Sequence, residues 1–423
     1  MVSPSGRDSS FGAFGTLVSW PSDYMTSEPP ILEPGNPTKT GAAADRPLTV
    51  LQVLPALVTG GVERGTVDMV TALSVAGHRA IVASSGGHMV QEVERGGGEH
   101  VLLPMRSKNP MVMWRNIGHL ARLIIAEKVD IVHARSRAPA WSAHYAARRT
   151  ATPFVTTVHG PYNGQNAAKR AYNSVMFRGD RVIATSGFIG DYLRQTAPEL
   201  TDARIRMIPR GVDLAQFDIS TVSAARKIQL AEAWAVPAGA PVILVPGRLV
   251  RWKGQRVMIE ALALLRDQDS VVVFAGGDVG HEAYKLELRR LAQRLGVEGR
   301  VRFVGTCRDM PAAYALASVV ASTSVEPEAF GRVAVESQAM GRPTVVTGIG
   351  GAMETVVPGE TGWWVDPDNA AQLAEAVETA VSLDQDARDA LASRAVAHIA
   401  ANFTKTLMCE RTISVYRELS GTA

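Results

Sequence analysis

Short apolar runs, separated by polar and glycine-rich segments, recur along the chain after residue 46. They are rich in β-branched residues, as in LTVLQVL (48–54), PVILVPGRL (241–249) and SVVVFAGGD (270–278). Such runs predict buried strands, and amphipathic stretches between several of them predict helices. Strands that alternate with helices form parallel sheets covered by helices on both faces. The pattern therefore predicts an α/β fold.

This alternation occurs twice, on either side of a turn-rich segment, IRMIPRGVDLAQF (205–217). A chain of 423 residues also exceeds the size at which one core keeps growing. We expect two doubly wound domains, residues 47–217 and 218–405, with a ligand cleft between them. Residues 1–46 lack hydrophobic periodicity and the pattern of a signal peptide, so we interpret them as a flexible extension, or as the product of an upstream start of translation, outside the fold.

Composition narrows the class of protein. A hydrophobic content of 46% and a charged content of 20% are typical of a soluble globular protein. The two cysteines, Cys307 and Cys409, are too few for a disulfide framework and fit a reducing cytosol. No run reaches the ~18 apolar residues of a membrane-spanning helix. We therefore expect a cytoplasmic protein.

Charge is distributed unevenly, although the net charge is only +3. Residues 101–181 hold 13 Lys and Arg against three acids. This suggests an anionic partner such as a membrane surface, lipid-linked phosphate or nucleic acid, or else a solvated surface offset elsewhere. The stretch 109–124 favours a membrane, because its apolar residues fall near one helical face, as would also happen in a helix packed on a core. These residues are Met113, Trp114, Ile117, Leu120 and Ile124.

Basic residues follow the first predicted strand of the second domain. The segment VPGRLVRWKG (245–254) presents Arg248 and Lys253 beside two glycines. An arginine can fork to two phosphate oxygens while a lysine supplies a point charge, so the pair could neutralise a diphosphate. Two basic residues on a loop can equally be solvated.

A second segment, VEPEAFGRVAVESQAMGRP (325–343), follows another predicted strand. Gly331 is expected to open a helix that ends at Gly341, and the free amides at its start favour an anion. Glu328 could then reach sugar hydroxyls, and Glu336 offers a carboxylate suited to a ribose diol. In isolation these glutamates could instead compensate the helix dipole and lie on the surface.

Together these segments resemble the retaining, nucleotide-sugar-dependent glycosyltransferases of family 4, which have the two-domain GT-B fold and include bacterial lipopolysaccharide and capsule enzymes. The resemblance covers roughly residues 47–420. It lies in GRLVRWKG, FAGGD, the segment from VRFVGTCRDM to GRPTVVT, and ETGWWV, in the family's order and approximate spacing. Glu328 and Glu336 match the family's pair of glutamates.

The resemblance implies a role for each matching residue. Arg248 and Lys253 would hold the donor diphosphate, Glu336 the ribose and Glu328 the transferred sugar. His159, in TTVHGPY, would lie at the lip of the acceptor site. Other matching residues would approach the donor, mostly through backbone atoms: Gly60, Gly61, Gly305, Cys307, Arg308, Phe330, Gly331 and Arg332.

The resemblance also implies that the first domain binds the acceptor and the second the donor, and that residues 406–423 form a helix returning to the first domain. Two positions depart from the pattern. Arg210 stands where many relatives have Asn, and Arg251-Trp252 replace smaller polar residues.

The implied reaction transfers a sugar from a UDP-sugar, or secondly a GDP-sugar, to a glycan or lipid-linked acceptor in lipopolysaccharide or other cell-surface polysaccharide synthesis. We expect retention of anomeric configuration, no required cofactor or metal, no nucleic-acid partner, and a peripheral position on the inner membrane face through residues 101–181. The alternatives are a nucleotide-sugar 2-epimerase, a non-catalytic nucleotide-sugar-binding protein and a dinucleotide-binding oxidoreductase. The last lacks a Gly-x-Gly-x-x-Gly after its first strand.

Overall fold

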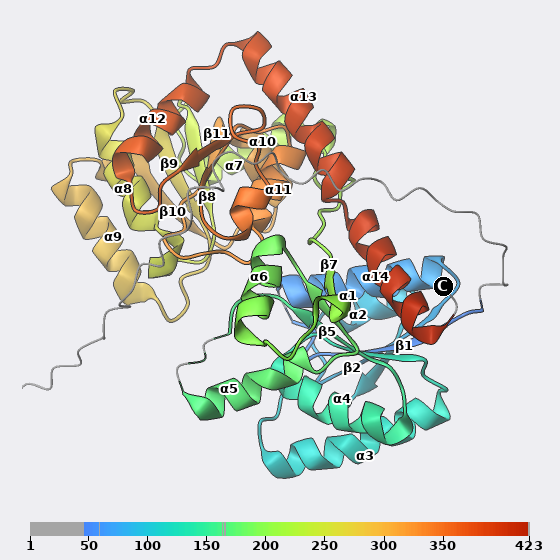
Figure 1. The fold of residues 1–423 in the computed structure, drawn as a ribbon. Coiled ribbons are helices and arrows are strands. Elements are labelled where there is room, and N and C mark those ends of the chain that lie inside the picture. The colour runs from blue at the N-terminus through green and yellow to red at the C-terminus, as the bar shows by residue number, and fades with distance from the viewer. Residues whose placement is uncertain (1–45, 59, 163, 165, 422–423) are drawn as a thin grey trace, which may run out of the picture. The chain divides into compact units, whose positions relative to one another are not determined.

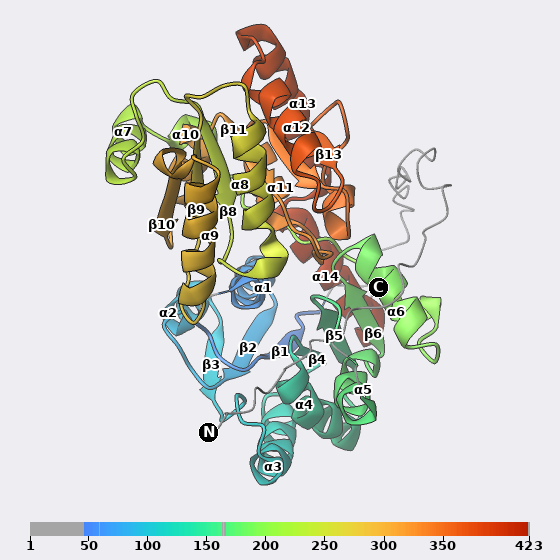
Figure 2. The same ribbon diagram turned by 90° about the vertical axis from the view of Figure 1, so that its left-hand side faces the viewer.

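The computed structural model describes residues 46–58, 60–162, 164 and 166–421. Two parallel sheets organise this part of the chain (Figures 1 and 2). We call the first sheet with its helices the N-lobe and the second sheet with its helices the C-lobe. The prediction of two doubly wound α/β arrays is confirmed.

The N-lobe sheet has seven parallel strands in the order β3-β2-β1-β4-β5-β6-β7. One core lies between the sheet and helices α3, α4 and α6, and another lies between its opposite face and α1, α2 and α14. The strands are β1 (Thr49–Val53), β2 (Arg79–Ser84), β3 (Glu99–Leu102), β4 (Ile131–Ala134), β5 (Phe154–Val158), β6 (Arg181–Ala184) and β7 (Ile205–Met207). The helices are α1 (Gly61–Val75), α2 (Val90–Arg95), α3 (Pro110–Ala126), α4 (Arg137–Thr150), α5 (Ala167–Asn173) and α6 (Gly187–Thr196).

The C-lobe sheet has six parallel strands in the order β10-β9-β8-β11-β12-β13. Helices α8, α9 and α12 cover one face, while α10, α11 and the ends of α7 and α13 pack on the other. The strands are β8 (Val242–Pro246), β9 (Val271–Ala275), β10 (Val301–Gly305), β11 (Val319–Ser322), β12 (Thr344–Thr347) and β13 (Trp363–Val365). The helices are α7 (Ala224–Ala233), α8 (Gln255–Leu264), α9 (Glu282–Arg294), α10 (Met310–Leu316), α11 (Arg332–Ala339), α12 (Ala370–Val381) and α13 (Gln385–Asn402).

The start of α11 requires a glycine, as the sequence predicted. Gly331 is the N-cap and has φ of +88°, in the left-handed region that favours glycine. A Cβ at this position would also lie 3.1 Å from the Cα of Ala352. The sharp change of direction at Gly331 therefore sets where the first amides of α11 point.

The last helix, α14 (Lys405–Ser420), follows the C-lobe in sequence but packs on the N-lobe. Figure 1 shows it in red beside α1. The chain crosses between the lobes near Val212 and again near Thr404, and these two segments form a parallel bridge. The Val212 amide donates to Phe403 O, and the Lys405 amide donates to Val212 O, both at 2.8 Å.

Tyr416 of α14 completes a buried polar chain inside the N-lobe. Its hydroxyl lies 2.6 Å from Nδ1 of His133, whose Nε2 lies 2.7 Å from Oγ1 of Thr157. His133 and Tyr416 are both fully buried. A buried ring nitrogen that loses its partner retains its desolvation cost.

We therefore expect Tyr416→Phe to lower the free energy of unfolding by about 1–3 kcal/mol. Thermal unfolding midpoints of the full chain would measure this. Tyr145→Phe is the matched control, because Tyr145 is exposed and its hydroxyl has no hydrogen bond to a described residue. Equal midpoints for the two variants would contradict the assignment.

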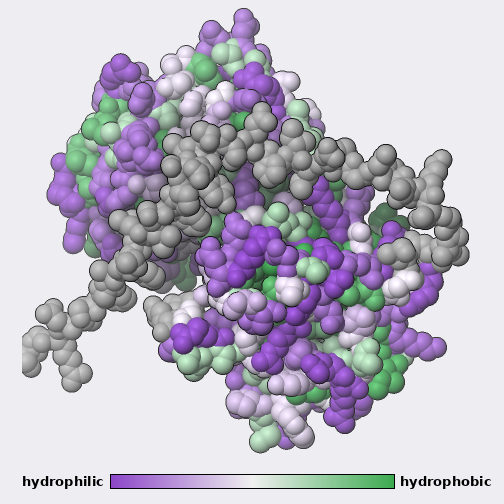
Figure 3. All heavy atoms as spheres, viewed as in Figure 1, coloured by the Kyte–Doolittle hydropathy of each residue, from purple (hydrophilic) through white to green (hydrophobic). Residues whose placement is uncertain are grey.

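Helix α3 corrects the predicted apolar face. Leu120 and Ile124 are buried against the N-lobe sheet, whereas Trp114 is 70% exposed. At 3.6 residues per turn, Trp114 is rotated by about 100° from its neighbour Met113 and so leaves the packed face. On the side of the molecule seen in Figure 3, hydrophobic residues form small groups among hydrophilic ones. In the described ranges, no helix has the length and apolar content needed to span a bilayer.

Candidate active site

Strand ends in the C-lobe approach each other closely at the carboxyl edge of the sheet. A Cβ on Gly276, which follows β9, would lie 1.8 Å from Gly247 O, which follows β8. A Cβ on Gly277 would lie 3.2 Å from Oγ1 of Thr306, which follows β10. Glycine thus lets three strand ends converge where ligands bind in parallel sheets.

One stretch predicted to approach the donor, mostly through backbone atoms, begins at Gly305, which has φ of +70°. Cys307 is partly buried, and burial raises the pKa of its thiol, which stays protonated at neutral pH. Arg308 is exposed. Asp309 caps α10 and pairs with Arg226 at 2.6 Å. This stretch offers backbone groups and a neutral thiol beside Gly277.

Lys253 and Glu328, predicted on separate segments, form a direct ion pair. Nζ of Lys253 lies 2.7 Å from Oε1 of Glu328, and both side chains are more than four-fifths buried. Lys253 belongs to a short 3-10 helix (Arg251–Lys253), and its ammonium lies 4.6 Å from the centre of the Trp252 ring. The carboxylate also accepts hydrogen bonds from Ser322, at 3.2 Å, and from Ser324.

The Glu328 carboxylate is ionised in this setting. Burial alone would raise its pKa, but the Lys253 charge and the hydrogen bonds from Lys253, Ser324 and Ser322 outweigh it, so the pKa is lowered. When the pKa of a carboxyl group is lower in the folded than in the unfolded protein, the group stabilises the fold at every pH above its unfolded pKa. This stability is lost as the pH falls through the folded pKa.

Glu328→Gln should therefore lower stability by about 1.5–3 kcal/mol near neutral pH. The deficit should shrink as the pH falls below about 4.3, where the unfolded carboxyl is protonated. Unfolding midpoints across this range would measure it. Glu326→Gln is the control, because Glu326 is exposed two residues away. A pH-independent deficit would show that the pair does not set this stability.

Arg248 remains available for a ligand. Its residue is exposed, and its side chain makes no ion pair or hydrogen bond within the described part of the chain. Its carbonyl accepts from Nε2 of Gln255 at 2.9 Å, which fixes the loop after β8. The guanidinium is therefore an unpaired cation on a fixed loop in the segment that also carries Lys253.

The helix start at Gly331 supplies further donors. The backbone amides of Phe330, Gly331 and Arg332 find no acceptor among the residues described here. The Phe330 ring is buried and packs edge-to-face on Phe403, with ring centres 5.7 Å apart. A helix start with free amides favours a bound anion.

Glu336 lies in the second turn of α11 and is 8% exposed. One carboxylate oxygen accepts from the Tyr314 hydroxyl at 2.8 Å, and the other accepts from Arg332 at 2.6 Å. A carboxylate has about four lone-pair sites, so two acceptor positions remain for a diol. Sequence reasoning missed both partners of Glu336.

Arg332 also links the helix start to the N-lobe. Gly60 caps α1 and Gly61 begins it. A Cβ on Gly61 would lie 3.4 Å from Nη1 of Arg332 and 3.6 Å from Nη2 of Arg210. The predicted glycine turn and the predicted anion-binding helix start are thus neighbours.

Arg210 fixes the tautomer of His159. Its guanidinium donates to Gly61 O and lies 3.3 Å from Nδ1 of His159. A guanidinium can only donate, so Nδ1 is the acceptor and the imidazole proton resides on Nε2. Burial first, and then the Arg210 and Arg135 charges, hold the pKa of His159 well below its usual value. His159 is therefore a neutral N–H donor, and its Nε2 has no partner among the described residues.

The carboxylates near Arg210 and Arg332 compensate only part of the positive charge there. Burial, followed by the charges of Arg135 and Arg332, lowers the pKa of Arg210 to about 9. Arg332 pairs with Glu336, whereas the Asp68 charge acts on Arg210 without a hydrogen bond, and no carboxylate of a described residue is hydrogen-bonded to Arg210. Positive charge beside the glycine turn is thus only partly compensated, an arrangement that suits an anion.

Two contacts that sequence reasoning did not foresee bring the lobes together. Ser186 Oγ donates to Ala329 O, beside Glu328. The Glu354 carboxylate accepts from the amides of Gly187 and Phe188, both at 2.7 Å, at the start of α6. A Cβ on Gly160 would lie 3.8 Å from Cβ of Ala329, so the His159 loop adjoins the glutamate loop. Ser186 has the sequence signal of a helix N-cap, whereas Glu354 has none.

Two doubly wound lobes with glycine-rich strand ends and a cationic cluster beside a helix start define a GT-B type of glycosyltransferase architecture. Comparison with known families agrees. Residues 59–216 match Glycosyltransferase Family 4, and residues 227–397 match Glycosyl transferases group 1. The chain belongs to these GT-B glycosyltransferases of group 1 and family 4.

Several known proteins are similar to this chain. D-inositol 3-phosphate glycosyltransferase 1 of Catenulispora acidiphila is 31% identical over 313 residues, which cover 68% of this chain and 72% of the relative. The Corynebacterium efficiens D-inositol 3-phosphate glycosyltransferase is 34% identical over 225 residues, 51% of each chain. The chain thus spans about half the length of this and several other curated relatives.

Solved structures share the fold. A glycosyltransferase from Rickettsia africae is 36% identical, with a TM-score of 0.82 over 88% of this chain and 98% of that one. Anabaena Alr3699/HepE, in complex with UDP and glucose, is 24% identical, with a TM-score of 0.77 over 88% of this chain and 100% of that one. The second likeness concerns the fold alone.

Proposed function

We propose that this protein transfers a sugar from a nucleoside-diphosphate sugar to an acceptor hydroxyl, with retention of anomeric configuration. The observation that carries this proposal is the Lys253–Glu328 pair, 2.7 Å apart, beside the free amides of α11. Lys253, the cation proposed to bind the diphosphate, therefore lies next to Glu328, the carboxylate proposed to bind the sugar. UDP is the favoured nucleotide and GDP the second.

In the proposed reaction, Arg248, Lys253 and the amides at Gly331 neutralise the diphosphate as it departs. Cationic groups positioned for developing negative charge do the work that a divalent ion would otherwise do, so we propose that no metal is required. The acceptor hydroxyl approaches from the leaving-group side and gives its proton to the departing phosphate oxygen. The carbon–oxygen bond to the diphosphate breaks as the bond to the acceptor forms.

Other side chains orient the substrates in this proposal. Glu328 accepts hydrogen bonds from hydroxyls of the transferred sugar, and Glu336 accepts from the ribose diol. The unpartnered Nε2–H of His159 donates to an oxygen of the bound substrates. An orienting donor in a buried site is effective because it does not need to reorganise during reaction.

Two acceptor classes are proposed. The basic segment 101–181 and the exposed Trp114 favour a lipid-linked glycan at a membrane surface, as in lipopolysaccharide or polysaccharide synthesis. The relatives described as D-inositol 3-phosphate glycosyltransferases favour a phosphorylated cyclitol instead. Transfer assays with inositol 3-phosphate and with lipid-linked glycans would separate them.

Donor binding is the first test of this proposal. A ligand that binds only the folded state raises the unfolding midpoint, so UDP, GDP and ADP and their sugars can be compared directly. We expect the largest rise with UDP or a UDP-sugar and a much smaller rise in Lys253→Ala. No rise with any of these nucleotides would refute the proposal.

Product analysis separates the reactions that a bound donor permits. Conversion of the nucleotide sugar without any acceptor would indicate a 2-epimerase. Binding without hydrolysis or transfer to any acceptor would indicate a sensor. The proposed function requires the free nucleoside diphosphate to appear together with a glycosylated acceptor of retained configuration.

A further inference from the structure

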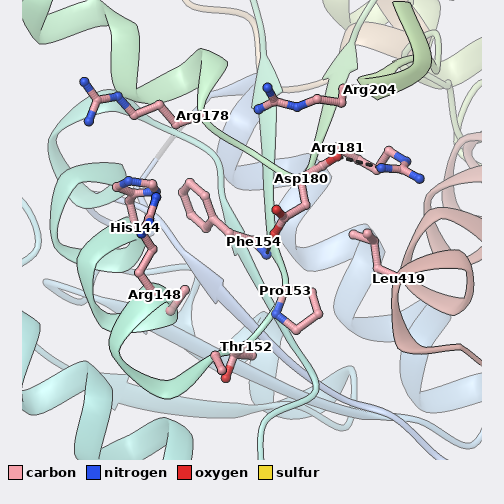
Figure 4. Close-up of a pocket in the computed structure, with 12 residues that line it drawn as sticks. His144, Arg148, Thr152, Pro153, Phe154, Arg178, Asp180, Arg181, Arg204 and Leu419 are labelled. Carbon is pink, nitrogen blue, oxygen red and sulfur yellow. Dashed lines mark hydrogen bonds between the residues drawn. The ribbon is translucent and has the colours of Figure 1, made fainter. Parts of the chain in front are cut away.

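A pocket of about 710 Å³ lies in the N-lobe, away from the candidate active site (Figure 4). Its walls come from the second half of α4, the first residues of β5 and β6, and Leu419 of α14. Phe154 lines the pocket at the first residue of β5, and His159 follows the last. At about 3.3 Å per residue, one strand of about 16 Å separates the two places. The pocket is therefore distinct from the proposed donor site.

Positive charge dominates the lining, where four arginines face one carboxylate, that of Asp180. Two of the arginines have protein partners. Arg181 pairs with Glu418 at 2.5 Å, and Arg204 donates to carbonyl groups of the chain before β6. Asp180 uses Oδ2 to accept the Phe154 amide at 2.8 Å.

The other two arginines, Arg148 and Arg178, are exposed and make no ion pair or hydrogen bond to a residue in the described ranges. The Arg178 guanidinium lies 5.1 Å from the centre of the Trp141 ring, which holds it in place. Both charges act on one imidazole, because burial and then Arg178 and Arg148 lower the pKa of His144. Arg148 of α4 and Arg178 before β6 both lie on the His144 side of the pocket (Figure 4).

His144 itself lacks a partner. It is 5% exposed and lines the pocket, and its Nδ1 makes no hydrogen bond to any described residue. Buried polar atoms normally have a partner, so this unpartnered Nδ1 is an exception in the pocket wall. Apart from Thr152, the rest of the wall is apolar and includes Pro153, Phe154 and Leu419.

We propose that this pocket binds a phosphate monoester attached to an apolar body. The phosphate is held by Arg148 and Arg178, and the body lies against Phe154 and Leu419. A phosphate monoester carries a charge of about −1.5 to −2 near pH 7, which two unpaired guanidinium groups match with forked hydrogen bonds. The same group occurs in free metabolites and in the headgroup of phosphatidic acid.

The test uses the full chain with phenyl phosphate and inorganic phosphate, titrated by calorimetry. We expect saturable binding of both, tighter for phenyl phosphate because its ring covers apolar wall. The double variant Arg148→Gln/Arg178→Gln should bind phenyl phosphate about 10- to 100-fold more weakly. Arg149→Gln is the matched control, because Arg149 is exposed next to Arg148 but does not line the pocket. Leu419→Ala should remove the advantage of the ring and leave inorganic phosphate binding unchanged.

Two further experiments test whether phenyl phosphate binds at this pocket and whether the natural ligand is a lipid or a soluble phosphate. Binding should persist in Lys253→Ala, which alters the proposed donor site alone. Binding to vesicles that contain phosphatidic acid is compared with binding to vesicles of phosphatidylglycerol, which is a phosphodiester. If the protein prefers phosphatidic acid and the double variant loses this preference, the ligand is a lipid. Equal binding to the two assigns a soluble phosphate.

Any of three results would overturn the proposal. The double variant could bind phenyl phosphate with unchanged affinity, Lys253→Ala could lose phenyl phosphate binding, or the wild type could show no saturable binding. Arg148→Gln alone guards against misfolding, because its side chain has no ion pair or hydrogen bond to a described residue to lose. This variant should weaken binding at an unchanged unfolding midpoint.

Discussion

Lys253→Ala should lower the rate constant of sugar transfer by about 10²- to 10³-fold, as removal of one oxyanion donor does in other enzymes. Lys253 is held 2.7 Å from Glu328, so its ammonium is already positioned before the donor binds. On the proposed mechanism the same ammonium also contacts a diphosphate whose charge grows as the bond breaks. An interaction that strengthens in the transition state raises kcat and not merely affinity.

The control for Lys253→Ala is another lysine of the C-lobe. Lys285 pairs with Asp278 at 2.6 Å, a bond of almost the same length. Lys285→Ala should leave kcat within about twofold, since a partly exposed ion pair that has no proposed contact with the substrates contributes little. Steady-state transfer rates at saturating donor would measure both variants. Wild-type turnover in Lys253→Ala would remove Lys253 from the mechanism.

Arg210→Met should lower kcat/KM by about 10- to 100-fold, the equivalent of one hydrogen bond to a charged group. Without the Arg210 guanidinium, Nδ1 of His159 loses its donor, and the ring populates both tautomers. The Nε2–H that we propose to contact substrate is then present only part of the time. Positive charge beside the Gly61 turn is also reduced.

The pH dependence separates this positioning role from a structural one. The Arg210 charge lowers the pKa of His159, so removing it should raise that pKa towards its usual value. In the wild type, His159 stays neutral as the pH falls from 8 to 6, and it contributes no change in rate there. In Arg210→Met, the loss of transfer rate at low pH should begin at a higher pH than in the wild type. Arg210→Lys should restore part of the transfer rate. A variant whose pH profile superimposes on the wild type would argue against the tautomer role.

Sequence patterns predicted both sheets because buried parallel strands are continuous apolar runs. They missed β3, β7 and β13, which have only four, three and three residues and are partly exposed. The Gly331 helix start followed from local chemistry. The Lys253–Glu328 ion pair could not be predicted from local chemistry, because it depends on β8 and β11 being neighbours despite their separation in sequence.

Contacts between residues far apart in the sequence were harder to predict. Arg210 stood out only as a departure from a family pattern, and its contact with His159 joins residues 51 positions apart. The arginine pocket was missed for a different reason. Its residues lie on helices and at the starts of strands, whereas the rule used to find ligands looks beyond strand ends. Side-chain direction on α3 was also uncertain, because Trp114 lies one residue away from the packed stripe.

The bridge between Val212 and Thr404 has a consequence for motion. Both connections between the lobes pass through it and are hydrogen-bonded to each other there. They therefore act as one hinge, and any opening of the lobes must turn about this point instead of sliding. For the same reason the N-lobe is discontinuous in sequence: a fragment that stops before α14 would expose the apolar groups that Met408, Ile413 and Tyr416 now cover.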